Sequence, residues 1–158
     1  MKTRAVTIRE SDEGEQRWFC GGGLHTWKVT ASESDGAFLM WESLEDAGKA
    51  TPVHLHAGAD ETFYLLEGEV VLYLDGETRP VHTGGVAVIP RGIPHAFRVT
   101  SPQARMLWVH TPGGAEAFYR EASDPVVAGE QRPPVDFGRV KAAAQSTGGA
   151  EILGPPPE

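Results

Sequence analysis

The stretch His54–Glu61 reads HLHAGADE, and it brings His54, His56 and Glu61, whose side chains can bind a metal, within eight consecutive residues. On a β-strand, residues two apart face the same side, so His54 and His56 project together. The small and polar residues after His56 predict a turn that returns Glu61 beside the two histidines. His95, which follows the segment PRGIP, is a fourth candidate. Three imidazoles and one carboxylate on neighbouring strands predict a site for one divalent first-row transition metal.

Glycines and prolines stand at fixed distances from these four residues. The first pattern is G-x5-H-x-H-x4-E-x6-G and runs from Gly48 to Gly68. The second pattern is G-x5-P-x-G-x2-H-x3-V, and its fixed positions are Gly84, Pro90, Gly92, His95 and Val99. In these two spacings the chain resembles the cupin superfamily, whose second motif ends in Asn where this chain has Val99. We assign the glycines and prolines themselves to turns and strand ends rather than to chemistry.

The resemblance implies a small jelly-roll β-barrel that holds a metal inside, near one mouth. By that likeness the metal ligands are His54, His56, Glu61 and His95, and the ion is Fe, Mn, Ni, Co or Zn. Neutral imidazoles and one carboxylate leave a divalent site with a charge of about +1, which favours a substrate with an anionic oxygen. Coordination positions that the protein does not use stay open for substrate, which favours catalysis over a structural role.

Composition and turn spacing predict an all-β fold, an antiparallel sandwich or barrel, which agrees with the resemblance. Among 158 residues there are 19 glycines and 12 prolines, and 40% of the chain is hydrophobic, which suits one domain with many turns. Short apolar or alternating runs predict strands at 24–30, 37–43, 52–56, 62–66, 69–74, 79–82, 86–89, 95–99 and 104–111. Short helices are predicted at 113–123 and 136–146, the second with Asp136 as its N-cap. We divide the chain into a polar N-terminal arm (1–16), a cupin β-barrel (17–112) and a helical, proline-rich extension (113–158).

Charge and cysteine content exclude several classes of partner. Fourteen Lys and Arg against 22 Asp and Glu give a net charge of −8 without any basic cluster, which disfavours nucleic acid. The single cysteine, Cys20, allows no internal disulfide, and no apolar run has the length of a signal peptide or membrane span. We therefore expect a cytoplasmic protein that does not associate with membranes. The resemblance implies a homodimer, for which Trp18-Phe19 and the proline-rich tail are candidate interface elements; packing within the chain is the alternative.

Apolar side chains are expected around the metal. Alternation from Glu61 and from His95 turns every second residue of their strands inward, and two tryptophans lie on strands that flank the motifs. The predicted substrate pocket consists of Phe63, Leu65, Phe97, Val99, Trp41 and Trp108. Together these side chains suit a flat, hydrophobic small molecule with few polar groups. His25, His82 and His110 fall outside the motifs and are assigned no part in the chemistry.

Three functions agree with this site. The stretches 54–68 and 90–97 resemble the quercetin 2,3-dioxygenase-like cupins, which implies a dioxygenase in which Glu61 is both a metal ligand and the base that takes the substrate hydroxyl proton. The second function is non-redox catalysis by a cyclase, isomerase or lyase, where the metal polarises a carbonyl. The third is a barrel that binds a small molecule without turnover. Metal identity and oxygen uptake separate the three, and no helix-turn-helix pattern accompanies the barrel.

Overall fold

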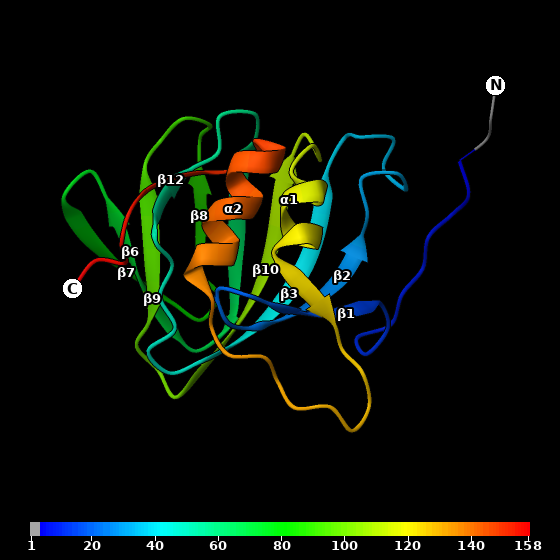
Figure 1. Ribbon diagram of the computed structural model, residues 1–158, viewed down its shortest axis with the longest axis horizontal. Helices are drawn as coiled ribbons and strands as arrows, with labels where there is room; N and C mark the ends of the chain where they lie inside the picture. Colours follow the sequence, from blue (N-terminus) through cyan, green and yellow to red (C-terminus); the bar gives the residue numbers. More distant parts are fainter. Residues whose placement is uncertain (1–3) are drawn as a thin grey trace.

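Two antiparallel β-sheets make up most of the molecule, and two short helices lie outside them (Figure 1). The structure is a computed structural model that describes residues 4–158. Across the larger sheet the strands are β11 (Ser123–Pro125), β1 (Glu15–Phe19), β2 (Leu24–Val29), β3 (Leu39–Asp46), β10 (Gln103–Thr111), β5 (Asp60–Glu67) and β8 (Val86–Ile89). Across the smaller sheet they are β12 (Glu151–Gly154), β4 (Val53–Leu55), β9 (His95–Val99), β6 (Glu69–Leu74) and β7 (Glu77–His82). Apolar side chains of both sheets join in one core, which confirms the predicted all-β jelly-roll class.

All the predicted strands are present, with ends that differ by three residues or fewer. The sequence did not predict β1, β11 and β12. The strand β1 begins at Glu15, inside the segment predicted as a polar arm, and pairs with β2 and β11. From the extension, β11 adds a strand to the larger sheet and β12 pairs with β4 in the smaller one. These three strands are short and lack an alternating apolar pattern, so their pairing depends on partners that lie far away in the sequence.

The register of the larger sheet brings the interior side chains into rows. On the interior strand β10, Trp108 lies opposite Trp41 of β3 on one side and Phe63 of β5 on the other. Two residues further along β10, His110 lies opposite Glu61 of β5. Side chains directly opposite each other on one face of a sheet are in contact range. The same register that builds the aromatic core therefore sets His110 beside Glu61.

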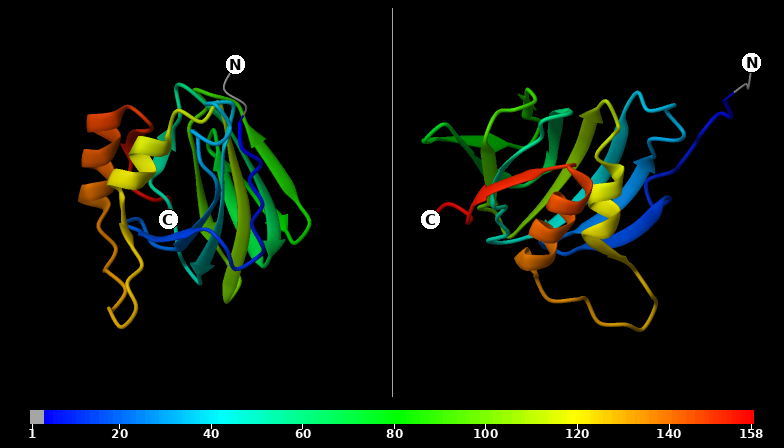
Figure 2. Two further views of the ribbon diagram at one scale, coloured as in Figure 1. Left: turned by 90° about the vertical axis from the view of Figure 1, so that its right-hand side faces the viewer. Right: turned by 45° about the horizontal axis from the view of Figure 1, so that its top comes forward.

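The helices α1 (Glu116–Glu121) and α2 (Phe137–Thr147) lie side by side outside the sheets (Figure 2). Both match the predicted helices, and the predicted N-cap is confirmed because the Asp136 carboxylate accepts a hydrogen bond from the backbone N–H of Arg139 at 3.0 Å. No helix in the described range 4–158 is long and apolar enough to cross a membrane.

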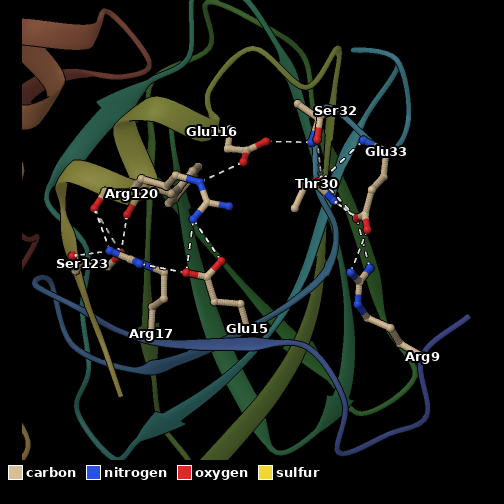
Figure 3. A network of polar contacts seen from close by, with 11 residues as sticks. Arg9, Glu15, Arg17, Thr30, Ser32, Glu33, Glu116, Arg120 and Ser123 are labelled. Atoms are coloured by element: carbon tan, nitrogen blue, oxygen red, sulfur yellow. Dashed lines mark hydrogen bonds and ion pairs between the residues drawn. The ribbon is translucent and has the colours of Figure 1, made fainter. Parts of the chain in front are cut away.

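A network of ion pairs ties α1 to the N-terminal strands (Figure 3). The Arg120 guanidinium donates to Glu15 on β1 at 3.0 Å and to Glu116 on its own helix at 2.9 Å. Glu116 in turn accepts from the backbone N–H of Ala31, just beyond β2, at 2.7 Å. These contacts fix the position of α1, which places Tyr119 in the interior.

The residues proposed as dimer contacts lie against their own chain. The Arg132 guanidinium lies 5.1 Å from the ring centroid of Trp18. The ring of Phe19 stacks on His25 with 4.9 Å between centroids, and the carbonyl of Pro157 in the tail accepts a hydrogen bond from Arg98. The homodimer stays a prediction.

Candidate metal centre

The four predicted ligands come together in one cluster. His54 lies on β4, His56 follows it directly, Glu61 is on β5 and His95 begins β9. Their ligand atoms all lie within 4.8 Å of one another. His54 and His95 are cross-strand partners, and the turn after His56 returns the chain so that Glu61 reaches the same point, as the sequence predicts. His56, Glu61 and His95 are each 3–4% exposed.

All three histidines present the same nitrogen to the centre. Nδ1 of His54 donates to the carbonyl of Pro52 at 2.8 Å, and Nδ1 of His95 donates to the carbonyl of Ile93 at 2.9 Å. Nδ1 of His56 donates to the carbonyl of Gly149 at 2.8 Å. A carbonyl can only accept, so each Nδ1 carries the proton and each neutral ring keeps its lone pair on Nε2. This is the tautomer that a metal ligand needs.

One buried atom shows how well the cluster suits a metal. Nε2 of His56 has no hydrogen-bond partner among residues 4–158, although the atom is inaccessible to solvent. A buried polar atom without a partner costs free energy, and a divalent cation at this point would give the lone pair an acceptor. Three imidazoles and a carboxylate are donors that suit first-row transition metals. The residues present therefore fit one divalent metal ion.

The electrostatics of the cluster favour a neutral imidazole at His54 and an ionised carboxylate at Glu61. Burial lowers the pKa of His54 to about 3. Burial alone would raise the pKa of Glu61, but the histidines around it, His56 first, hold that pKa well below its usual range. Burial also opposes the charged form of His95, yet its 2.7 Å hydrogen bond to Glu61 Oε2 gives a net rise in its pKa. A divalent cation would take the place of the proton that His95 and Glu61 share.

His110 belongs to this site, although it lies outside both motifs. Its side chain is 0% exposed, and its Nε2 lies 2.9 Å from Glu61 Oε1 and 3.3 Å from the hydroxyl of Tyr119. The assignment of no role is therefore corrected: His110 holds one oxygen of the predicted ligand Glu61. Residues two apart on a strand face the same side, so the predicted inward position of Trp108 already indicated that His110 also points into the barrel. His82, in contrast, takes no part in the cluster: its side chain is 68% exposed.

A pocket adjoins the cluster, and six Phe, Trp and Tyr side chains form part of its wall. Its free volume is about 60 Å³, and both His54 and Glu61 line it. Of the predicted pocket residues, Trp41, Trp108 and Phe97 lie in its wall. Phe63, Leu65 and Val99 also face inward but lie in the packed core, where they support the wall rather than form it. The wall also includes side chains that the sequence did not suggest, namely Phe19, His25, Glu45, Lys49, Phe118 and Tyr119.

Fold and site define a class of small β-barrels whose interior carries a cluster of three histidines and one glutamate. The chain belongs to the cupin superfamily: the family model described as Cupin domain matches residues 40–110. Quercetin 2,3-dioxygenase of Bacillus subtilis (strain 168) is 32% identical over 118 residues, which are 75% of this chain and 35% of that protein. The polyketide synthase CurC of Streptomyces cyaneus is 29% identical over 113 residues, which are 71% of each chain. A predicted oxalate decarboxylase from Thermotoga maritima superposes with a TM-score of 0.60 at 22% identity and covers 68% of this chain and 99% of its own.

The likeness to the oxalate decarboxylase structure concerns the fold alone. The chain spans about a third of the length of the Bacillus quercetin 2,3-dioxygenase that it matches. What those relatives act on therefore bears on this chain only as a proposal.

Proposed function

We propose that the protein is a metal-dependent dioxygenase that acts on a flat aromatic or enolisable small molecule. The observation that carries this proposal is the double position of Glu61, which belongs to the histidine cluster and also lines the aromatic pocket. A substrate in the pocket therefore reaches the metal cluster and a carboxylate base together. The similarity to quercetin 2,3-dioxygenases from Bacillus subtilis and Aspergillus japonicus supports this choice of reaction.

In this proposal His54, His56, His95 and Glu61 hold one divalent metal. When bound, the metal would supply a cationic centre that takes the deprotonated oxygen of the substrate and brings substrate and dioxygen together. Glu61 takes the proton of the substrate hydroxyl on its carboxylate, which the N–H of His110 holds in place through Oε1. The aromatic wall orients the ring system and keeps water from the reacting atoms.

The experiment begins with elemental analysis of the purified protein and continues with an oxygen electrode and a series of flavonol, catechol and β-diketone substrates. We expect iron, manganese, nickel or cobalt and oxygen consumption with at least one substrate. His56→Ala should lower metal occupancy sharply, while His82→Ala, on the exposed surface, should leave it unchanged. Equal occupancy in both variants would contradict the ligand assignment.

A non-redox cyclase, isomerase or lyase is the second candidate. The similarity to the polyketide synthase CurC, which extends over 71% of both chains, favours it. In that reaction the same cluster would polarise a carbonyl, and Glu61 would move a proton without any oxidant. Turnover under strict exclusion of oxygen, or activity with zinc alone, would support this candidate and contradict the dioxygenase. Binding of a ligand without formation of any product would instead support the third function, a barrel that binds a small molecule without turnover.

Two further parts of the proposal need separate measurements. A homodimer is proposed from the family resemblance, and sedimentation equilibrium tests it. A cytoplasmic location is proposed from the single cysteine, and cell fractionation tests that.

A further inference from the structure

Tyr119 brings a hydroxyl group to the pocket from outside the barrel strands. It lies on α1, beyond the residues that the family model matches, and its side chain is 6% exposed. It lines the pocket together with His54 and Glu61. Its ring centroid lies 4.6 Å from that of Trp41 and 5.4 Å from that of His110. This packing gives the hydroxyl a fixed place in the pocket wall, next to His110.

The imidazole of His110 carries its proton on Nε2. This nitrogen lies 2.9 Å from Oε1 of Glu61, a carboxylate oxygen that can only accept a hydrogen bond. Nδ1 of His110 has no hydrogen-bond partner among residues 4–158. With the proton on Nδ1, the lone pair of Nε2 would face the negative carboxylate without any bond between them. The N–H therefore belongs to Nε2.

The hydroxyl hydrogen of Tyr119 is consequently left without an acceptor. In the part of the chain that the structure describes, the hydrogen-bond contact of this hydroxyl is with Nε2 of His110 alone, at 3.3 Å. Because Nε2 carries a proton, it can donate to the phenol oxygen but cannot accept from it. A buried donor without an acceptor costs free energy, and the adjoining pocket is where an acceptor can enter.

The hydroxyl of Tyr119 and the carboxylate of Glu61 lie close enough to contact one small molecule. Both are in contact with Nε2 of His110, so the two oxygens are no further apart than the sum of those two distances. The free volume of the pocket, about 60 Å³, gives room for a few heavy atoms. A unit with oxygens on two adjacent carbons has this size and offers one oxygen to each side.

We propose that Tyr119 donates a hydrogen bond to the substrate, at an oxygen on the carbon next to the metal-binding group. The inference rests on the proposed function, because the metal cluster holds the first oxygen of the same molecule. The substrate class is a compact α-hydroxyketone, 1,2-diketone or α-hydroxy acid, whose second oxygen is an acceptor. A fixed donor stabilises this oxygen, and more so when negative charge develops on it. Tyr119 is thus a specificity-determining residue that the C-terminal extension supplies.

Two anions with the same number of heavy atoms test this contact in the protein loaded with Co²⁺. Glycolate has a hydroxyl group beside its carboxylate, and propionate has a methyl group at the same place. Titrations followed by the visible absorption of Co²⁺ give the two dissociation constants. The constant for glycolate should be roughly fivefold lower, the usual effect of one neutral hydrogen bond. Tyr119→Phe should remove this preference and leave the affinity for propionate unchanged.

A control and a second measurement separate binding from a structural effect. Tyr64→Phe removes a hydroxyl from a 44% exposed side chain on the outward face of β5 and should keep the preference. Chelator competition should give the same affinity for Co²⁺ in Tyr119→Phe and in the wild type. A lower metal affinity with the preference for glycolate intact would mean that Tyr119 acts only through His110, which would overturn the inference. Circular dichroism checks that each variant is folded.

The outcomes also separate this inference from the proposed function. If glycolate brings no gain, if the gain persists in Tyr119→Phe because the metal alone chelates the hydroxyl, or if neither anion changes the Co²⁺ spectrum, the inference is wrong. The oxygen-electrode measurement then decides the proposed function by itself. If the preference depends on Tyr119 but no substrate consumes oxygen, the dioxygenase is wrong and the contact with Tyr119 stands.

Discussion

Nδ1 of His56 donates a hydrogen bond to the carbonyl oxygen of Gly149 at 2.8 Å, although 93 residues separate the two in the sequence. Gly149 lies between α2 and β12, and β12 pairs with β4, the strand that ends just before His56. A fixed carbonyl at Nδ1 sets both the tautomer and the orientation of the ring. The C-terminal extension therefore fixes the tautomer and the ring orientation of His56, one of the predicted metal ligands.

Gly149→Ala should weaken metal binding. A Cβ at this position would lie 2.4 Å from Cβ of Phe118, so the segment would have to move and take its carbonyl away from His56. Loss of such a hydrogen bond to a ligand typically lowers metal affinity about 10- to 100-fold. Competition with a chelator measures the affinity. The matched control is Gly154→Ala, where an added Cβ meets nothing within 4 Å, and an equal affinity in the two variants would contradict the prediction.

His110 should act as a positioning residue through Glu61. Because its Nε2 holds Glu61 Oε1 at 2.9 Å, His110→Leu should leave the carboxylate free to rotate and lower metal affinity about 10-fold or more. His110→Gln keeps an N–H donor and should recover part of that loss. Chelator competition gives the affinities, and thermal melting of the metal-free proteins shows whether packing alone has changed. If both variants lose affinity only in proportion to their stability, His110 has a packing role and no more.

The sequence was sufficient for the ligand cluster because its geometry is local. His54 and His56 share a strand face, and one short turn returns Glu61, so strand alternation predicts their approach. His95 was found through the spacing of the second motif. The inferences for His54, His56 and Glu61 need only a strand and a turn, whereas that for His95 depends on the resemblance, and the structure brings the four side chains together.

The residues that hold the predicted ligands in place can be predicted only when the register between distant strands is known. His110 reaches Glu61 only because β10 and β5 pair in one register, and Gly149 reaches His56 only through the pairing of β12 with β4. No local pattern marks a glycine carbonyl as a partner of a histidine. Glu45 also escaped notice, because the predicted strand ended at Ser43 while β3 continues to Asp46. Its inward direction follows only once the strand is extended.

Arg120→Ala should destabilise the attachment of α1. The guanidinium bridges Glu15 and Glu116 and lies 4.5 Å from the ring centroid of Trp27, so the change removes two ion pairs and a cation–π contact. Together these are worth about 1 kcal/mol at a partly exposed site, which corresponds to a fall in Tm of about 2–4 °C. Arg79→Ala, which removes an exposed ion pair on β7, should change Tm by less than about 1 °C. Differential scanning calorimetry of both variants is the measurement, and an equal change would contradict the prediction.

The free energy of unfolding should depend on pH through the titration of Glu45. Its carboxyl has a pKa of about 7 in the folded protein and about 4.5 when exposed, so the native state binds the extra proton between these values. Stability from this group is therefore complete below about pH 4.5 and is lost as pH rises to about 7. The difference of about 2.5 pKa units corresponds to about 3 kcal/mol. The charges that act on Glu45 are Lys49 and Arg132, which favour the ionised form, and Asp46, which opposes it.

Glu45→Gln isolates this contribution because it removes the titration and keeps the shape of the side chain. Relative to the wild type, the variant should gain stability steadily from pH 5 to pH 7.5 and then level off, as a carboxylate that is costly to bury is replaced by an amide. Urea unfolding at a series of pH values, with metal removed so that ligand binding does not contribute, gives the difference. Glu42→Gln on the outward face of the same strand should show a flat difference over this range. A flat difference for Glu45→Gln as well would mean that water reaches the carboxylate in solution, which would contradict the pKa rise expected from burial.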